Sequence, residues 1–140
     1  AKRLSNKYFD WLENELIEAE DFPYVIVAGH FPVWSIAEHG PTQCLVDRLR
    51  PLLHKYKVSA YMCGHDHNLQ HIRDTYLNHT VEYLLSGASN FVDNSTDHIN
   101  SIPANSLVFH WAETLQVVNG GFGLTNVNSD KMTFTFYESS

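Results

Sequence analysis

The fold of this chain is decided by residues 58–67, which read Val-Ser-Ala-Tyr-Met-Cys-Gly-His-Asp-His. The apolar run predicts a buried β-strand, and a glycine and two histidines, His65 and His67, follow it directly. The same order occurs earlier in the chain, where residues 24–30 read Tyr-Val-Ile-Val-Ala-Gly-His and end at His30. Imidazole often binds transition metals near neutral pH, and open α/β sheets place their sites at the carboxyl ends of strands. The repeated pattern therefore predicts part of a metal site.

A helix is expected between these two runs. Thr42 is a suitable N-cap, and apolar residues recur at helical spacing from there to Tyr56, although Pro51 predicts a kink or restart near Arg50. The run over residues 24–28 predicts a strand buried on both faces. Strand, helix and strand over this length form a βαβ unit, whose strands are parallel and end at one edge of the sheet. We therefore expect His30 to lie close to the two later histidines.

The flanking sequence extends this unit in both directions. Helical periodicity predicts a surface helix over residues 4–19, with an apolar face made of Leu4, Tyr8, Trp11, Leu12, Leu16 and Ala19. Short strands are expected at residues 81–86, 107–112, 121–127 and 132–138, and the last alternates as an antiparallel strand with one buried face would. The expected fold class is α/β, of the mixed α+β kind: a βαβ unit followed by mostly antiparallel strands, with no internal domain boundary.

Composition narrows the class of protein. The chain has 140 residues, 44% of them hydrophobic, which suits one ordinary domain. A formal net charge of −7 with nine Lys and Arg argues against a nucleic-acid partner or a membrane-surface partner. The apolar stretches are too short for a transmembrane helix, and no secretory signal opens the chain. Sequons at Asn78 and Asn94 favour a secretory route with N-glycans.

The longer motifs resemble a known family. Val-Ala-Gly-His at residues 27–30 and Gly-His-Asp-His at 64–67 are similar to the calcineurin-like metallophosphoesterases. The sequence around these two motifs most resembles the purple acid phosphatases of the tartrate-resistant, mammalian-type branch. It includes Phe-Pro-Val-Trp-Ser-Ile-Ala-Glu-His-Gly-Pro-Thr at 31–42, Leu-Arg-Pro-Leu-Leu at 49–53 and Leu-Ser-Gly-Ala at 85–88. This resemblance runs from about residue 4 to residue 91 and fades after residue 94.

The resemblance implies a site and a reaction. His30 and His65 would bind the divalent metal of a binuclear centre, and His67 would bind Fe(III), with Fe(II), Zn or Mn as the second metal. The centre would hydrolyse phosphate monoesters by attack of a metal-bound hydroxide. His39 is the candidate acid or phosphate contact, with Glu38 beside it. Asp66 lies between two implied ligands. It is expected to orient the sharp corner that the chain makes at residues 64–67, and not to bind metal.

The same resemblance implies that the chain is incomplete. The family's Gly-Asp-x-x-Tyr and Gly-Asn-His segments do not occur in this sequence. The chain is therefore expected to be the carboxyl-terminal part of one catalytic domain, the second half of a four-layer α-β-β-α sandwich whose strand at residues 24–28 lacks a neighbour. Its expected partner is the amino-terminal half of the same protein. In some relatives a disulfide links the two halves, and Cys44 occupies the position that would form it here. The implied product is a secreted or lysosomal glycoprotein.

Two other functions remain open. One is a different binuclear metallophosphoesterase, acting on phosphodiesters or phosphoproteins. The other is an inactive secreted fragment that binds or serves as a scaffold, because the upstream ligands are absent. The Trp-Ser-Ile-Ala-Glu-His-Gly loop at residues 34–40 favours the acid phosphatase over the other phosphoesterases. Bound metal and phosphomonoesterase activity, measured with and without the upstream half, would discriminate the inactive fragment.

Overall fold

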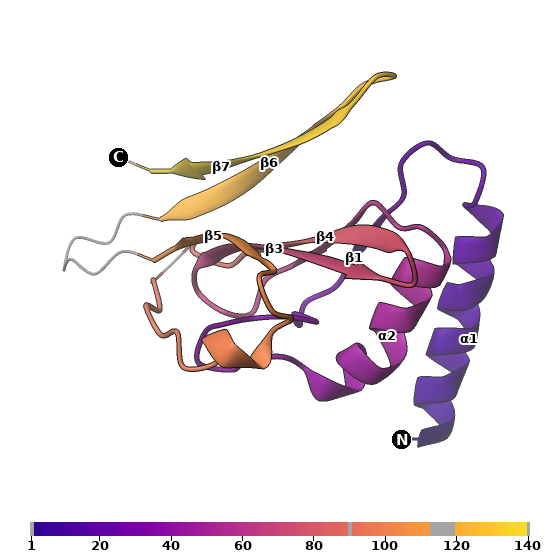
Figure 1. Ribbon diagram of the computed structural model, residues 1–140, viewed down its shortest axis with the longest axis horizontal. Helices are drawn as coiled ribbons and strands as arrows, with labels where there is room; N and C mark the ends of the chain where they lie inside the picture. The colour runs from indigo at the N-terminus through magenta and orange to yellow at the C-terminus, as the bar shows by residue number, and fades with distance from the viewer. Residues whose placement is uncertain (1, 90, 113–119, 140) are drawn as a thin grey trace.

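A computed structural model describes residues 2–89, 91–112 and 120–139, apart from the side chains of residues 2–5 (Figure 1). Its elements in chain order are α1 (Lys2–Glu18), β1 (Ile26–Ala28), α2 (Gln43–Lys55), β2 (Ala60–Cys63), β3 (Leu69–Tyr76), β4 (His79–Ser86), a short 3₁₀ helix (Ile99–Ser101), β5 (Leu107–Trp111), β6 (Gly121–Val127) and β7 (Met132–Glu138). No helix in the described ranges has the length and apolar character needed to cross a membrane.

The strands form a mixed five-stranded sheet and a separate hairpin. The sheet order is β1-β2-β4-β3-β5, in which β1, β2 and β4 are parallel and β3 runs antiparallel to β4 and β5. The β6–β7 hairpin lies over one face of this sheet, and α1 and α2 lie on the other side (Figure 1). The α/β class, the βαβ unit and the later strands are therefore confirmed.

The core lies between the sheet and α2, and it is closed by a loop. Leu53 of α2 and Val58 and Val81 near the sheet are fully buried. Residues 33–37, which form neither helix nor strand, are buried as completely as the sheet. This loop joins β1 to α2, so the segment that follows His30 is fixed by the core.

Helix α2 begins where the sequence predicts. Thr42 is its N-cap, although the Thr42 side chain makes no capping hydrogen bond. A restart near Arg50 is wrong, because α2 continues through Pro51 to Lys55, and a kink there stays a prediction. Proline there removes one backbone donor, and burial of Leu49 and Leu53 on either side holds the helix together.

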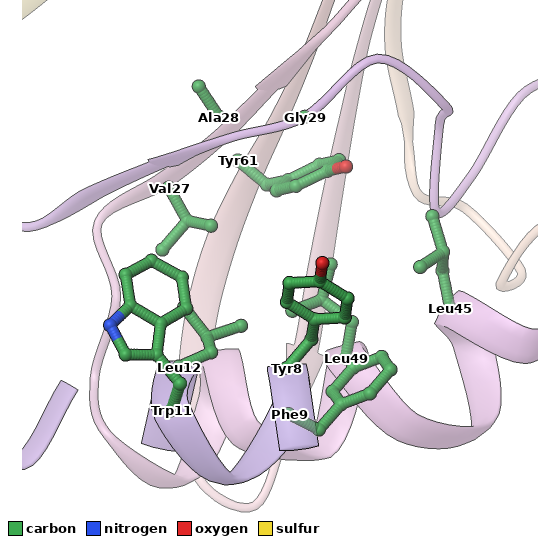
Figure 2. Close-up of a pocket in the computed structure, with 10 residues that line it drawn as sticks. All are labelled: Tyr8, Phe9, Trp11, Leu12, Val27, Ala28, Gly29, Leu45, Leu49 and Tyr61. Atoms are coloured by element: carbon green, nitrogen blue, oxygen red, sulfur yellow. The ribbon is translucent and has the colours of Figure 1, made fainter. Parts of the chain in front are cut away.

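Helix α1 contacts the core through a narrower face than the periodicity indicates. Leu16 is buried and Phe9 and Leu12 are partly buried against the core, whereas Tyr8 and Trp11 are 68% and 58% exposed. Their predicted burial is wrong. Both side chains line an open apolar groove of about 240 Å³ between α1, α2 and β1 (Figure 2). The side chain of Leu4 lies outside the described residues.

Strand β1 is an edge strand. It was expected to be buried on both faces, but Ile26 and Ala28 are exposed. The reason is its position: in the described chain its neighbour is β2, and the opposite edge is unpaired. β1 therefore has a neighbour on one side only, and its apolar residues lie at a solvent-facing edge of the described chain.

Strand β3 was not predicted. It carries Gln70, Arg73 and Asp74 among its apolar residues, so it has no simple alternation. It joins β4 through a two-residue turn in which Leu77 and Asn78 have φ values of 51° and 58°. Such turns need positive φ at both positions and strongly favour glycine after Asn or Asp. Leucine followed by asparagine gives no such signal, which is why the hairpin was missed.

A buried ion pair ties β3 to α2 and to the core loop. Asp74 is 3% exposed and accepts hydrogen bonds from Arg50 Nε at 2.6 Å, Arg50 Nη2 at 3.1 Å and Trp34 Nε1 at 3.3 Å. His54 Nε2 lies 3.4 Å from the same carboxylate and 3.0 Å from the Tyr83 hydroxyl. Burial alone would raise the pKa of Asp74, but hydrogen bonds from His54 and Arg50 outweigh it and hold that pKa well below its usual range.

Replacing this carboxylate tests the network. We expect Asp74→Asn to lower the free energy of unfolding by about 3 kcal/mol at neutral pH, because Arg50 loses its buried partner. A depressed pKa contributes stability above the unfolded-state value of about 4, and that stability is lost as the pH falls through the native value. Urea denaturation between about pH 5 and pH 2 should therefore be less pH-dependent in Asp74→Asn than in the wild type. Asp10→Asn, exposed on α1, should leave both unchanged.

Candidate metal centre

The parallel ladder brings two of the predicted ligands together. β1 and β2 pair in register from Ile26 opposite Ala60 to Ala28 opposite Met62. The pairing continues past the strands, because the Gly29 N–H donates to the Met62 carbonyl at 3.0 Å and the Gly64 N–H to the His30 carbonyl at 3.1 Å. His30 Nε2 and His65 Nδ1 consequently lie 3.1 Å apart.

This separation suits a shared metal ion. Two nitrogens bound to one metal at about 2.0–2.1 Å lie about 3 Å from each other. Both rings sit at the solvent-facing end of the sheet, and no carboxylate intervenes between them. The predicted proximity of His30 to His65 is therefore confirmed, and their role as metal ligands stays a prediction.

Two consecutive γ-turns aim the histidines. The Asp66 N–H donates to the Gly64 carbonyl, and the Asn68 N–H donates to the Asp66 carbonyl, both at 3.0 Å. His65 and His67 are therefore the central residues of the two turns. His65 has a φ of 73°, the value of the rarer and more strained γ-turn. Strain of this kind costs about 1–3 kcal/mol and persists where the surroundings impose it.

The close backbone approach at residues 64–67 requires glycine at position 87 and not at position 64. A β-carbon on Gly64 would meet one neighbour within 4 Å, the Ser86 carbonyl at 3.7 Å, which is ordinary contact. A β-carbon on Gly87 would lie 2.0 Å from the Asp66 carbonyl oxygen. Gly87 follows β4, and its N–H donates to the Asn68 carbonyl at 3.0 Å. The absence of a side chain at Gly87 therefore lets β4 press against the corner.

Among the described residues, His67 and Glu38 make no hydrogen bond or ring contact with the His30–His65 pair. The His67 ring packs edge-on against Phe91, with ring centroids 4.0 Å apart. Glu38 is exposed, and its backbone N–H donates to Asp93 Oδ2 at 3.4 Å. The backbone N–H of Asp93 in turn donates to the His67 carbonyl at 2.8 Å. The polar segment after β4 is thus fixed across the site; Asn90, within it, lies outside the described residues.

His39 joins the cluster through Asp66. His39 Nδ1 lies 2.5 Å from Asp66 Oδ1, and its ring centroid is 4.5 Å from that of His65. Among the described residues, His39, His65 and Asp66 form a group whose ligand-type atoms lie within 4.8 Å of one another. Asp66 is 1% exposed, and its other oxygen accepts a short hydrogen bond from the Ser35 hydroxyl. Both oxygens are therefore engaged, and we interpret the carboxylate as an orienting group, as expected from the sequence.

Neutral imidazole is favoured at His65. Burial lowers the pKa of His65 first, and the neighbouring His39 lowers it further. Neutral imidazole is the form that binds metals. Burial also raises the pKa of the Cys63 thiol, at the end of β2, to about 12.

Comparison with known proteins covers nearly the whole chain. Residues 2–69 match the model of the calcineurin-like phosphoesterases. The chain is 50% identical to tartrate-resistant acid phosphatase type 5 of Oryctolagus cuniculus over 98% of this chain and 40% of that protein. It is 49% identical to the Homo sapiens protein of the same name, over 99% of this chain and 41% of the relative. Purple acid phosphatase 7 of Arabidopsis thaliana is 43% identical over 48% of this chain.

The chain therefore spans about two fifths of the length of the mammalian relatives it matches. The expectation that the resemblance fades after residue 94 is wrong, since the mammalian matches continue through the later strands. In three dimensions the chain is similar to a solved structure titled "GAP50 the anchor in the inner membrane complex of Plasmodium". The TM-score is 0.76 and the identity 20%, over 97% of this chain and 39% of that one. At that identity the likeness concerns the fold.

Two glycine substitutions test how the corner is built. We expect Gly87→Ala to lower the free energy of unfolding by about 1–3 kcal/mol, because the new methyl group would overlap the Asp66 carbonyl. It should also weaken metal binding, since His65 and His67 would be displaced. Gly64→Ala is the matched control and should change neither quantity. Thermal denaturation and metal titration check both variants; equal losses in the two would contradict this account of the corner.

Proposed function

We propose that this chain belongs to the calcineurin-like phosphoesterases, whose model its residues 2–69 match, and that it is the carboxyl-terminal part of an acid phosphatase that hydrolyses phosphate monoesters. The observation that carries the proposal is the 3.1 Å approach of His30 Nε2 to His65 Nδ1 at the strand ends. It occurs in a chain about half identical to tartrate-resistant acid phosphatases. An anionic substrate suits an acidic chain when bound cations dominate the local field.

Similarity to metallophosphoesterases implies a metal cofactor, and we propose its identity and ligands. His30 and His65 would hold a divalent ion, Fe(II), Zn or Mn, and His67 would contribute to Fe(III). Bound metals would supply Lewis-acid stabilisation of the phosphate and activation of water. Ferric iron prefers oxygen ligands, and both oxygens of Asp66 are already hydrogen-bonded. We therefore assign the missing oxygen ligands to the part of the protein outside this chain.

His39 is the proposed proton donor or phosphate contact. Its side chain is 54% exposed at the site, beside His65, while its Nδ1 is held by a fully buried carboxylate. The Nε2 atom, on the other side of the ring, is available to a phosphate oxygen. Glu38 is exposed next to it and is proposed to contact the substrate or its water.

The proposed partner is the amino-terminal half of the same protein. The groove beside the unpaired β1 edge exposes the apolar side chain of Trp11 (Figure 2). Ile26 of β1 and Phe22 before it are also exposed. An exposed apolar edge of this kind is normally covered. Cys44 is exposed and unbonded near the start of α2, so it is accessible to a disulfide with that half. Exposed Asn78 and Asn94 would carry N-glycans in a secreted or lysosomal product.

Two other functions share these observations. A binuclear phosphoesterase for diesters or phosphoproteins would use the same histidines. Its substrate preference distinguishes it from an acid phosphatase. A binding or scaffold role without catalysis would use the same surfaces without a complete metal site, because the family's upstream ligand segments do not occur in this chain. Our choice between them rests on the high identity to proteins named as acid phosphatases.

Metal content and substrate preference decide among these functions. In the complete protein we expect bound iron and faster hydrolysis of p-nitrophenyl phosphate than of bis(p-nitrophenyl) phosphate. His65→Ala should reduce the rate of p-nitrophenyl phosphate hydrolysis at least about 100-fold, because the divalent metal loses one of its proposed ligands. The control His71→Gln, paired with Glu82 on β3 and β4, should retain metal and activity. Protein without iron whose activity survives His65→Ala would contradict the phosphatase proposal.

Amide exchange tests the proposed partner. The Val25 carbonyl accepts from Ser59, and the Gly29 N–H donates to Met62, so alternation in a parallel ladder turns the N–H groups of Ile26 and Ala28 away from β2. We expect these two amides to exchange rapidly in the chain alone and to slow at least about tenfold when the amino-terminal half is supplied, because a new strand would accept their hydrogen bonds. The Val27 amide, which faces β2, is the internal control. Unchanged exchange at Ile26 and Ala28 would exclude pairing at this edge.

A further inference from the structure

We propose that Ser35 and Asp66 form a buried positioning relay that fixes one tautomer and one orientation of His39. The relay is a chain of hydrogen bonds that begins inside the core and ends at the exposed His39 ring. This inference rests on the proposed function insofar as it concerns catalysis, because His39 is the proposed proton donor or phosphate contact. The hydrogen bonds themselves do not depend on that function.

The inner part of the relay is fully satisfied. Gln70 Nε2 donates to Ser35 Oγ at 2.9 Å, and the Ala37 N–H donates to the same oxygen at 3.1 Å. Gln70 Oε1 accepts from the Ile36 N–H at 3.0 Å. With two donors already directed at it, Ser35 Oγ has its own proton left for Asp66 Oδ2. Because a hydroxyl has one proton and two lone pairs, this arrangement leaves no alternative direction for the Ser35 proton.

The outer part of the relay determines the state of His39. An ionised carboxylate accepts hydrogen bonds and does not donate them, so the nitrogen that faces Asp66 Oδ1, His39 Nδ1, must carry a proton. A neutral His39 is thereby held as the Nδ1–H tautomer, with the Nε2 lone pair towards the site. The protonated ring, held in the same orientation by Asp66, presents the Nε2–H that a proton donor or phosphate contact requires. With Asp66 fully buried and His39 54% exposed, the carboxylate is rigid and the ring is the member that reaches solvent.

A purely structural role would explain less of this geometry. The buried loop is already held by Gln70, by the Trp34–Asp74 hydrogen bond and by contacts of His98 with the Ile36 and Ala37 carbonyls. The contact from Asp66 to His39 adds nothing to that loop, since His39 lies outside it and is exposed. Asp66 also sits between the γ-turns of His65 and His67. The relay therefore sets the position of His39 relative to the two proposed metal ligands.

The decisive experiment is a double-mutant cycle in the complete protein. We expect Asp66→Asn to lower kcat for p-nitrophenyl phosphate about 10- to 100-fold with bound metal unchanged, as misplacement of a reacting group by about 1 Å can do. The double variant His39→Ala/Asp66→Asn should be no slower than His39→Ala alone, because Asp66 acts through His39. A further tenfold loss in the double variant would overturn the proposal. Asp97→Asn, on the exposed segment before the 3₁₀ helix, is the matched control and should behave as the wild type.

A spectroscopic measurement separates this proposal from the phosphatase proposal. Nitrogen-15 spectra of the metal-free, histidine-labelled protein should show His39 as the Nδ1–H tautomer, and Asp66→Asn should shift it towards the Nε2–H form that free histidine favours. This readout requires no catalysis, so it stands even if no phosphatase activity is found. Should Asp66→Asn fail to fold, the wild-type spectrum decides alone: an Nε2–H His39 overturns the proposal.

Discussion

The site depends on one constraint, the parallel pairing of β1 with β2 and of β2 with β4. Parallel strands end at one edge, so the three segments that follow β1, β2 and β4 meet there. Each contributes something different: β1 delivers His30, β2 delivers the His65–His67 corner, and β4 delivers Gly87. Since side chains alternate along a strand, a register shift of one residue would separate His30 from His65 and reverse both faces of the sheet.

Buried polar groups of β3 hold the loop between β1 and α2 at two points. Trp34 donates to Asp74, which also pairs with Arg50 of α2. Ser35 and the following backbone are held by Gln70 of β3. Buried polar networks of this kind are costly when incomplete and rigid when complete. Among the described buried side-chain polar atoms, Ser106 Oγ and His110 Nε2 lack a partner, and neither belongs to these networks.

Much of this architecture could be predicted from the sequence, for identifiable reasons. The runs ending at His30 and His67 are punctuated by Gly-His, and residues 132–138 alternate cleanly, so their strands were predicted. β3 was missed because Gln70 and Asp74 interrupt its apolar pattern for the sake of buried networks that periodicity cannot express. The meeting of His30 with His65 followed from topology. The contact of His39 with Asp66 did not, because it depends on a side-chain path across the loop; Gly87 was missed because a close backbone approach leaves no local pattern.

The burial of residues 33–37 has a consequence for how this sequence can vary. Connecting segments usually lie on the surface, where insertions and deletions accumulate with little cost. Here a segment without helix or strand fills the core, bonds to β3 through its backbone and side chains, and sets the distance from His30 to His39. Its length is therefore as restricted as that of a central strand. Natural and engineered length variation should instead collect at exposed turns such as residues 77–78 and 128–130, far from the chemistry along the chain.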